Sequence, residues 1–530
     1  PQTDISSSIN LPPDAPKLYY SLGNLNWEKS TWVNPMSILL KKFETTTENI
    51  ICNALISYKI LPGLELKATF GFNNIAQREH VQIPISSYDP ALPASGTAGF
   101  GNNVIRTFIA EPQLNFRKNF GKKNLALLAG YTLQSTTQNA LYQSGTGYTS
   151  DELLGSLKAA SFINTSNEID SRYRYLGLFS RLNFDWDKKY FVTITLRRDG
   201  SSRYGPANRF ANFGSLGFAW VFKREKFIGE NSILSFGKLK GSAGVTGNDQ
   251  IGDYKYLDLY SPYSYSYLGT TPFQPVQLFN SNFGWERVKK LEAGLELAFF
   301  RERILFTANY YHNITNKQLV SYALPQVTGF PGVLQNLPAK ILNHGIELEL
   351  SGLIIDKSNF KWSGSLNFSV PKNKLLAFNN IEGSSYANTY VVGQSLFIAQ
   401  RYAYTGVDPN IGNYTFLDVN GDGKISSPVD MSAVVFTGQQ YFGGLQNNFS
   451  HKRLSFSFLF QFVRQENAPN YLSRFGRPGT MTNQPTFVLD RWRSPGDEST
   501  FQKYADSNSA SNTAFSNYRS SDAAFSDASF

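Results

Sequence analysis

One stretch of this 530-residue chain has the spacing of a cation-binding loop. In DVNGDGKI, carboxylate and amide side chains stand at the first, third and fifth positions of a calcium loop, followed by a turn-forming glycine. The loop lacks the usual closing Glu, because its last acidic residue stands at position 13 instead of 12. Two interpretations therefore stay open, a calcium site or an Asx-rich turn surrounded by water. The candidate ligands are Asp418, Asn420, Asp422, Lys424 through its carbonyl, and Asp430.

Other residues with metal-binding or catalytic side chains do not have the spacing of a site. The four histidines are far apart in the sequence, and the one cysteine has no partner for a disulfide or a metal. Two carboxylates sharing a site would allow glycoside hydrolysis, but Glu347 and Glu349 are two residues apart and so share one face of a strand. We expect them to line a lumen or contact a plug, and we expect the chain not to be an enzyme and to hold no cofactor other than calcium.

Aromatic side chains in the expected loops are the better candidates for ligand contact. Sugar rings and other ligands present apolar faces that stack on indole and phenol rings. Packing within the loops, or against a partner protein, is the alternative role for each of them. The candidates are Trp27, Trp32, Tyr260, Tyr263, Tyr265, Tyr267, Phe273 and Trp492.

The composition indicates that strands would carry any contact with a membrane. Aromatic residues make up 15% of the chain and charged residues 17%, which is typical of β-rich proteins. The mean hydropathy is −0.30, and no apolar run approaches the length of about 18 residues that a membrane-spanning helix needs. The net charge of +10 comes from Lys and Arg that look scattered along the chain, so nucleic acid is not an expected partner.

Apolar and polar residues alternate over segments of about ten residues along nearly the whole chain, which predicts strands with one apolar and one polar face. From Leu454 to Phe462, for example, phenylalanines stand at every second position and are separated mainly by Ser and Gln. Such strands are longer than those usual in a soluble sandwich, and about 14 of them follow one another. This pattern predicts an all-β, antiparallel transmembrane barrel.

The expected connections alternate between very short turns and long loops, as in outer-membrane barrels with tight periplasmic turns and long extracellular loops. Long loops are expected at about 75–107, 138–171, 248–285, 317–339 and 373–437. The chain is divided accordingly into an extracellular loop at 1–49, barrel strands with their loops at 50–464, and an extracellular loop at 465–530 that ends before the next strand.

Several segments resemble, in order, the SusC/RagA-like family of TonB-linked outer-membrane transporters, the TonB-dependent receptors. They are YFVTITLRRDGSSRYGPANRF at 190–210, GKLKGSAGVTGNDQIGDY at 237–254, NSNFGWERVKKLEAGLELAFFRERILFTANYYHNITNKQL at 280–319, NHGIELEL at 343–350, GVDPNIGNYTFLDVNGDGKI at 406–425 and YFGGLQNNFSHKRLSFSFLFQF at 441–462.

The resemblance implies a barrel of 22 strands with a plug, of which this chain would supply about the sixth to the nineteenth strand, without the plug and the last strands. It also implies active import of oligosaccharides (glycans) or peptides across the outer membrane of a Bacteroidota-like Gram-negative cell. Expected partners are a SusD-like surface lipoprotein, the TonB-ExbB-ExbD complex and outer-membrane lipid. The alternatives are a TonB-dependent receptor for a siderophore or cobalamin, and a passive porin or structural surface barrel.

Overall fold

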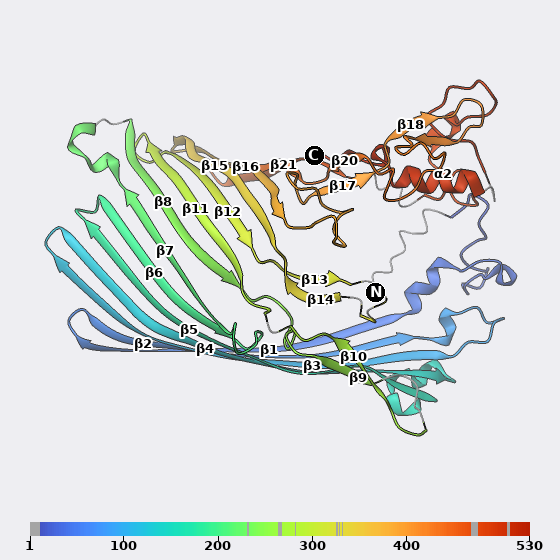
Figure 1. Cartoon of the computed structure of the whole chain (residues 1–530), viewed down its shortest axis with the longest axis horizontal. Helices are drawn as coiled ribbons and strands as arrows, with labels where there is room; N and C mark the ends of the chain where they lie inside the picture. The colour runs from blue at the N-terminus through green and yellow to red at the C-terminus, as the bar shows by residue number, and fades with distance from the viewer. Residues whose placement is uncertain are drawn as a thin grey trace.

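The computed structural model describes residues 11–229, 233–262, 268–280, 282–324, 327, 329–330, 332–467, 475–505 and 509–530. Within these ranges one antiparallel sheet contains fifteen strands, and each pairs with the sheet strands before and after it in the sequence. Figure 1 shows the sheet as a wide, curved wall that does not close on itself. The predicted fold class, an antiparallel barrel sheet of about 14 long strands, is confirmed.

The sheet strands are β1 (Lys42–Leu61), β2 (Leu64–Ile83), β3 (Gly96–Phe120), β4 (Lys123–Tyr148), β5 (Phe162–Trp186), β6 (Tyr190–Ser201), β7 (Phe210–Trp220), β8 (Leu234–Asn248), β11 (Glu286–Phe299), β12 (Ile304–Asn316), β15 (Ala339–Lys357), β16 (Phe360–Phe378), β21 (Gln439–His451), β22 (Leu454–Asn467) and β23 (Ser526–Asp527). Short hairpins lie within three of the connections. They pair β9 (Leu259–Pro262) with β10 (Phe273–Gln277), β13 (Leu319–Ala323) with β14 (Gly332–Asn336), β17 (Ile398–Arg401) with β20 (Ala433–Phe436), and β18 (Tyr404–Val407) with β19 (Tyr414–Phe416).

Helical segments are short. The α-helix is α2 (Ser509–Arg519), and the 3-10 turns are η2 (Glu28–Ser30), η3 (Pro35–Leu40), η4 (Ile85–Ser87), η5 (Asp151–Gly155), η6 (Leu157–Ala159), η7 (Phe222–Arg224), η8 (Lys226–Ile228), η10 (Thr486–Asp490) and η11 (Asp522–Ala524). Across the described ranges, no helix is long and apolar enough to cross a membrane.

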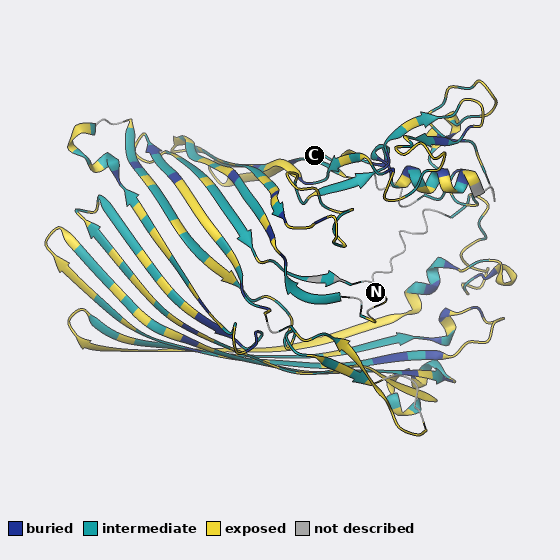
Figure 2. Ribbon diagram, in the orientation of Figure 1, coloured by how far each residue is buried: buried dark blue, intermediate teal, exposed yellow. Residues whose placement is uncertain are grey.

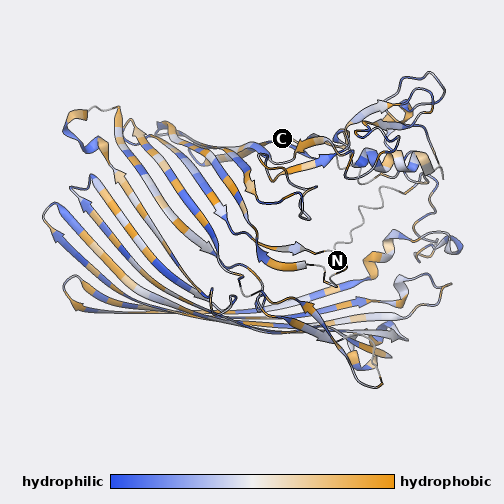
Figure 3. Ribbon diagram, viewed as in Figure 1, coloured by the Kyte–Doolittle hydropathy of each residue, from blue (hydrophilic) through white to orange (hydrophobic). Residues whose placement is uncertain are grey.

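The alternation of the sequence sets the register of the sheet. Leu348 pairs with Ala308 on β12 and Phe368 on β16, whereas its neighbour Glu347 pairs with Asn309 and Ser369. Because a slip of one residue would exchange the two faces, the alternating pattern fixes the pairing. Each strand therefore has an apolar face and a polar face, and the alternating colours along the strands in Figure 3 show this.

The sheet has two different rims, called here the short-turn rim and the long-loop rim. At the short-turn rim only two residues join β1 to β2, β3 to β4, β15 to β16 and β21 to β22. Gly63, in the first of these turns, has a φ of 87° and leaves no room for a Cβ against the carbonyl oxygen of Arg117. Glycine is required there for both reasons. The hairpins β9–β10, β13–β14, β17–β20 and β18–β19 belong to connections at the opposite, long-loop rim.

Two of the predicted long loops are much shorter than expected. The connections predicted at 75–107 and 138–171 are in fact 84–95 and 149–161, because β2 to β5 run for 20 to 26 residues. The first strand likewise begins at Lys42, before the predicted boundary at residue 50. Towards the long-loop rim both faces of these strands carry polar residues, for example Gln77 and Arg78, so the alternation disappears although the pairing continues.

The segment after β22 is more ordered than the predicted loop at 465–530. It contains η10 and α2, and its end returns to the sheet where Ser526 pairs with Asn467 and Asp527 with Glu466. The next strand therefore begins within the chain. At the opposite edge of the sheet, β1 pairs only with β2 among the described strands, and all 20 of its residues are exposed, as Figure 2 shows. An edge of this kind presents unpaired backbone groups.

Candidate functional site

The candidate site is the polar face of β8, β11, β12 and β15. Strand alternation places Lys240, Asn309 and Glu347 on this face, since each pairs into one row that runs from Lys240 through Gly294 and Asn309 to Glu347. The predicted placement of Glu347 and Glu349 on one polar face is confirmed, because they pair with Asn309 and Thr307.

Charges on this face are paired across neighbouring strands. The ammonium nitrogens of Lys238 and Lys240 lie 3.2 and 2.7 Å from the two carboxylate oxygens of Glu296. All three side chains are half-buried, so water reaches them without separating them. One carboxylate thus neutralises part of the charge of two lysines from the strand next to it.

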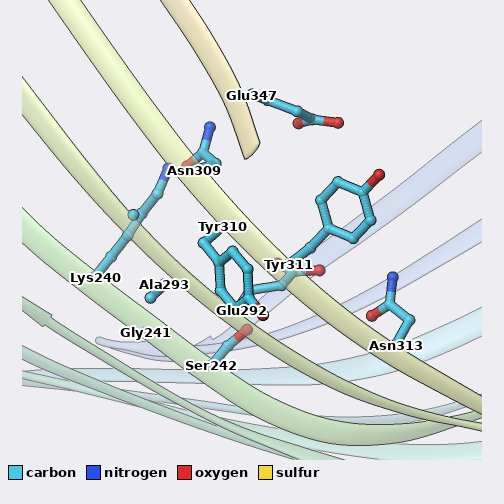
Figure 4. Close-up of a pocket in the computed structure, with 11 residues that line it drawn as sticks. Lys240, Gly241, Ser242, Glu292, Ala293, Asn309, Tyr310, Tyr311, Asn313 and Glu347 are labelled. Atoms are coloured by element: carbon cyan, nitrogen blue, oxygen red, sulfur yellow. The ribbon is translucent and has the colours of Figure 1, made fainter. Parts of the chain in front are cut away.

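A hollow of about 510 Å³ lies beside this ion-pair cluster. At its centre Gly294 leaves space that a side chain would fill, because an added Cβ would stand 2.6 Å from the amide oxygen of Asn309. Figure 4 shows the residues around it. The lining offers hydrogen-bond donors and acceptors: Lys240, Ser242, Glu292, Asn309, Tyr311, Asn313 and Glu347, with Gly241, Ala293, Gly294 and Tyr310 contributing the remaining surface. Glu292 and Glu347 form no ion pair with any residue in the described ranges.

A second polar cluster fastens the loop after β8 to the sheet at the long-loop rim. The Arg203 guanidinium donates to the Asp253 carboxylate at 2.9 Å and to the Asp249 carbonyl at 3.0 Å, and it lies 4.2 Å from the centre of the Tyr173 ring. The Tyr173 hydroxyl donates to the Asp249 carboxylate at 2.8 Å. Burial raises the pKa of the neighbouring Tyr204, whose hydroxyl donates to the Asn248 carbonyl at 2.9 Å. These contacts give the loop a defined start.

The predicted ligand-binding aromatics do not form one cluster. Tyr260 and Phe273 lie in the β9–β10 hairpin and are 59% and 69% exposed. Trp27 is only 8% exposed, and Trp32 is half-buried in the same N-terminal segment. Trp492 donates from its indole nitrogen to the Pro409 carbonyl at 2.8 Å, so it supports a loop. Tyr263, Tyr265 and Tyr267 lie outside the described residues. A ligand-binding role for the whole set stays a prediction.

The predicted calcium loop is folded around its own backbone. The Asp418 carboxylate accepts the backbone N–H groups of Gly421 and Gly423 at 2.8 and 2.7 Å. The buried Asp430 carboxylate accepts those of Val419 and Ser426 at 2.9 and 2.7 Å, and these hydrogen bonds hold its pKa below the usual range.

The two remaining side-chain ligands of this loop also bond locally. Asn420 donates to the Asp422 carboxylate at 2.9 Å, and Asp422 accepts the Lys424 N–H at 2.8 Å. The described part of the chain holds no group of three or more His, Cys, Asp and Glu side chains placed to bind a metal ion. Calcium binding stays a prediction, and the local hydrogen bonds suit the Asx-turn interpretation.

The expectation that Lys and Arg are merely scattered is wrong for one region. Five basic residues that are far apart in the sequence come together on the apolar face of β11, β15 and β16, beyond the last wholly apolar row. A basic residue at every second position, as in Arg287 with Lys289 and Lys372 with Lys374, is the signal that could have revealed this patch. The same reasoning, applied to Lys238 and Lys240, could have found the ion-pair cluster on the polar face.

Taken together, the sheet is a piece of the wall of a membrane barrel, with an apolar face for lipid, a polar face for a lumen, and one rim of long loops. The chain belongs to the TonB dependent receptor-like, beta-barrel family, whose model matches residues 57–459. Barrels of this family lie in the outer membrane.

Curated relatives and a solved structure agree with this membership. TonB-dependent receptor P39 of Formosa agariphila is 26% identical over 480 residues, covering 80% of this chain and 45% of that protein. TonB-dependent receptor SusC of Bacteroides thetaiotaomicron is 27% identical over 453 residues, covering 80% and 44%. The structure of the RagAB peptide transporter has the same fold, with a TM-score of 0.81 at 23% identity, covering 98% of this chain and 57% of that one. The chain spans about half the length of the curated relatives that it matches.

Proposed function

We propose that this chain is part of the barrel wall of an active outer-membrane transporter that imports oligosaccharides or peptides and draws its energy from the TonB-ExbB-ExbD complex. The observation that carries this proposal is the two-faced sheet, because a lipid-facing wall with charged and amide groups on its other side suits the passage of a polar solute. Membership of the TonB receptor family supports energy coupling, and the names of the SusC and RagAB relatives support the substrate classes.

In this proposal the long-loop rim faces the outside of the cell and the short-turn rim faces the periplasm, as is usual for barrels of this kind. A SusD-like lipoprotein would dock on the long-loop rim. The hairpins β9–β10 and β13–β14 and the segment around α2 would provide much of the surface there. Aromatic residues of this rim, such as Tyr260 and Phe273, would contact the substrate or the lipoprotein.

Uptake by the full-length gene product in its host tests the function. Cells lacking the gene should fail to take up one labelled oligosaccharide or peptide library, and the restored gene should bring uptake back. A protonophore should stop that uptake, because TonB transmits the energy of the proton gradient. Uptake that continues without the gradient would indicate a passive porin, and restored uptake of only a ferric siderophore or cobalamin would indicate the alternative receptor.

The hollow on the polar face can be tested in the same cells. The double substitution Glu292→Gln and Glu347→Gln removes two unpaired carboxylates from its lining. If the solute passes this part of the wall, uptake should fall several-fold while the amount of assembled protein stays constant. Glu349→Gln is the matched control, because Glu349 lies on the same face of β15 outside the hollow. Equal uptake by the double variant and the control would remove the hollow from the transport path.

A further inference from the structure

The apolar face of β11, β12, β15 and β16 changes character between two neighbouring rows of paired residues. The last wholly apolar row consists of Ala293, Tyr310, Ile346 and Val370. Its largest side chains are open to the surroundings, since Ile346 is 49% and Tyr310 41% exposed. Such a row is suited to the hydrocarbon of a membrane, and it marks the upper edge of the apolar band on these four strands.

Basic residues occupy the three rows that follow towards the long-loop rim. These rows are Leu291, His312, His344 and Lys372, then Lys289, Ile314, Leu342 and Lys374, then Arg287, Asn316 and Lys340. None of the three rows contains an Asp or a Glu. The basic patch is defined here as the five exposed cations Arg287, Lys289, Lys340, Lys372 and Lys374.

The cations of the basic patch have no anionic partner in the protein. Within the described ranges none of the five forms an ion pair, whereas Lys238 and Lys240 share Glu296 on the polar face of the adjoining strands. Two further basic side chains, His312 and His344, add to the patch at its lower border, where their rings lie 6.2 Å apart. Five cations gathered without a carboxylate repel one another unless an anion from outside the chain joins them.

The spacing of the patch suits a phosphate group. Neighbouring strands lie about 4.8 Å apart and alternate residues on a strand about 7 Å apart, so Lys372, Lys374 and Lys340 stand within about 8 Å of one another. Long Lys and Arg side chains can converge on one phosphate from such positions. Ile314 and Leu342 lie between the cations and provide apolar surface for their aliphatic stems.

We propose that the basic patch binds the phosphate groups of an anionic lipid headgroup, in the membrane leaflet next to the long-loop rim. A lipid fits this place better than a soluble anion, because the acyl chains would lie on the apolar row directly below while the phosphates meet the cations. Basic residues beside a membrane surface attract anionic lipid in this way. The site adds a lipid-binding function to the outer surface of the wall, and it rests on the proposed orientation in the outer membrane.

Lipid binding to the purified full-length protein tests the proposal. Phosphorylated lipid A and dephosphorylated lipid A would each be titrated into the protein in neutral detergent, with bound lipid counted by native mass spectrometry. The test variant is the triple substitution Lys289→Gln, Lys372→Gln and Lys374→Gln. The control variant is Lys357→Gln, Lys361→Gln and Lys452→Gln, which removes the same charge at the short-turn rim of the neighbouring strands.

The native protein should prefer the phosphorylated lipid, and the test variant should bind it about a hundredfold more weakly, since each lysine near a membrane surface contributes about one kcal/mol. The control variant should bind like the native protein. Equal binding of both lipids, or equal binding by native protein and test variant, would overturn the proposal. Displacement of the lipid by millimolar inorganic phosphate would overturn it as well, because the patch would then be a site for free anions.

Folding and transport are read separately from lipid binding. Heat-modifiable migration of each variant in a gel shows whether the barrel has assembled, and a test variant that fails to assemble is replaced by the single substitution Lys374→Gln, expected to weaken binding about fivefold. Uptake without lipid preference would leave the transport function standing and remove the lipid site. Lipid preference without uptake of any substrate would do the reverse.

Discussion

The two faces of neighbouring strands carry their charges in opposite ways. On the polar face of β8 and β11, Lys238 and Lys240 both contact the Glu296 carboxylate. On the apolar face of β11, β15 and β16, the five cations of the basic patch have no carboxylate beside them in any of their rows. The difference shows that the same residue type serves two purposes: paired charges line a wet wall, and unpaired cations at the edge of an apolar band await an anion from the surroundings.

The largest expected effect comes from placing a charge on the wrong face. Ala308 and Asn309 are neighbours on β12, but Ala308 pairs with Leu295 and Leu348 on the apolar face, and Asn309 pairs with Gly294 and Glu347 on the polar face. Ala308→Arg should lower the free energy of unfolding of the full-length protein in lipid vesicles by about 2–4 kcal/mol, because it puts an Arg among acyl chains.

The matched variant is Asn309→Arg, one residue further along the same strand. It places the guanidinium next to the unpaired Glu347 carboxylate and should change the free energy of unfolding by less than about 1 kcal/mol. Denaturant titration of both variants in the same vesicles makes the measurement. Similar losses from the two substitutions would show that the faces do not differ in their surroundings.

This contrast between the faces was largely predictable from the sequence. Alternation of residues such as Phe456, Ser457 and Phe458 sets both the strands and the face that each side chain joins, so the succession of long strands and the polar placement of Glu347 followed from it. The ends of β2 to β5 did not, because water contacts both faces beyond the membrane and the sequence loses its period of two.

Clusters that join several strands were also beyond reach, because pairing partners lie far apart in the chain. Lys240 meets Glu296 across 56 positions, and Arg203 meets Asp253 across 50. The family resemblance drew attention to the segments that contain these residues but gave them no role. Only the register shows that they face each other.

A second prediction concerns the long-loop rim above the polar face. Arg203→Lys keeps the charge but loses the planar guanidinium that reaches both Asp253 and the Asp249 carbonyl and stacks on Tyr173. The loop should open locally at a cost of about 1–2 kcal/mol. Hydrogen exchange of residues 249–258 should speed up roughly tenfold, while exchange in β12 stays unchanged. Uniform acceleration across the sheet would show that Arg203 supports the strands and not the loop.

A third prediction tests the paired charges of the polar face. Glu296→Gln removes the carboxylate that both lysines share, so Lys238 and Lys240 remain as two neighbouring cations. Because all three side chains reach water, the expected loss in free energy of unfolding is only about 1 kcal/mol, and it should shrink at high salt. Glu349→Gln, whose carboxylate has no ion pair within the described ranges, serves as the control and should change little. A salt-independent loss would point to packing instead of charge.

The smallest effect is expected outside both faces, in the loop around Asp418. Asp418→Ala removes the acceptor for the Gly421 and Gly423 N–H groups, but water can replace it at this exposed place, so the free energy of unfolding should fall by no more than about 1 kcal/mol. The same variant tests the predicted calcium site. If calcium binds, titration calorimetry on the full-length protein should show a heat that Asp418→Ala abolishes. Identical heats for both proteins would leave the loop as an Asx-rich turn, whose carboxylates are satisfied by its own backbone just as the lysines of the polar face are satisfied by Glu296.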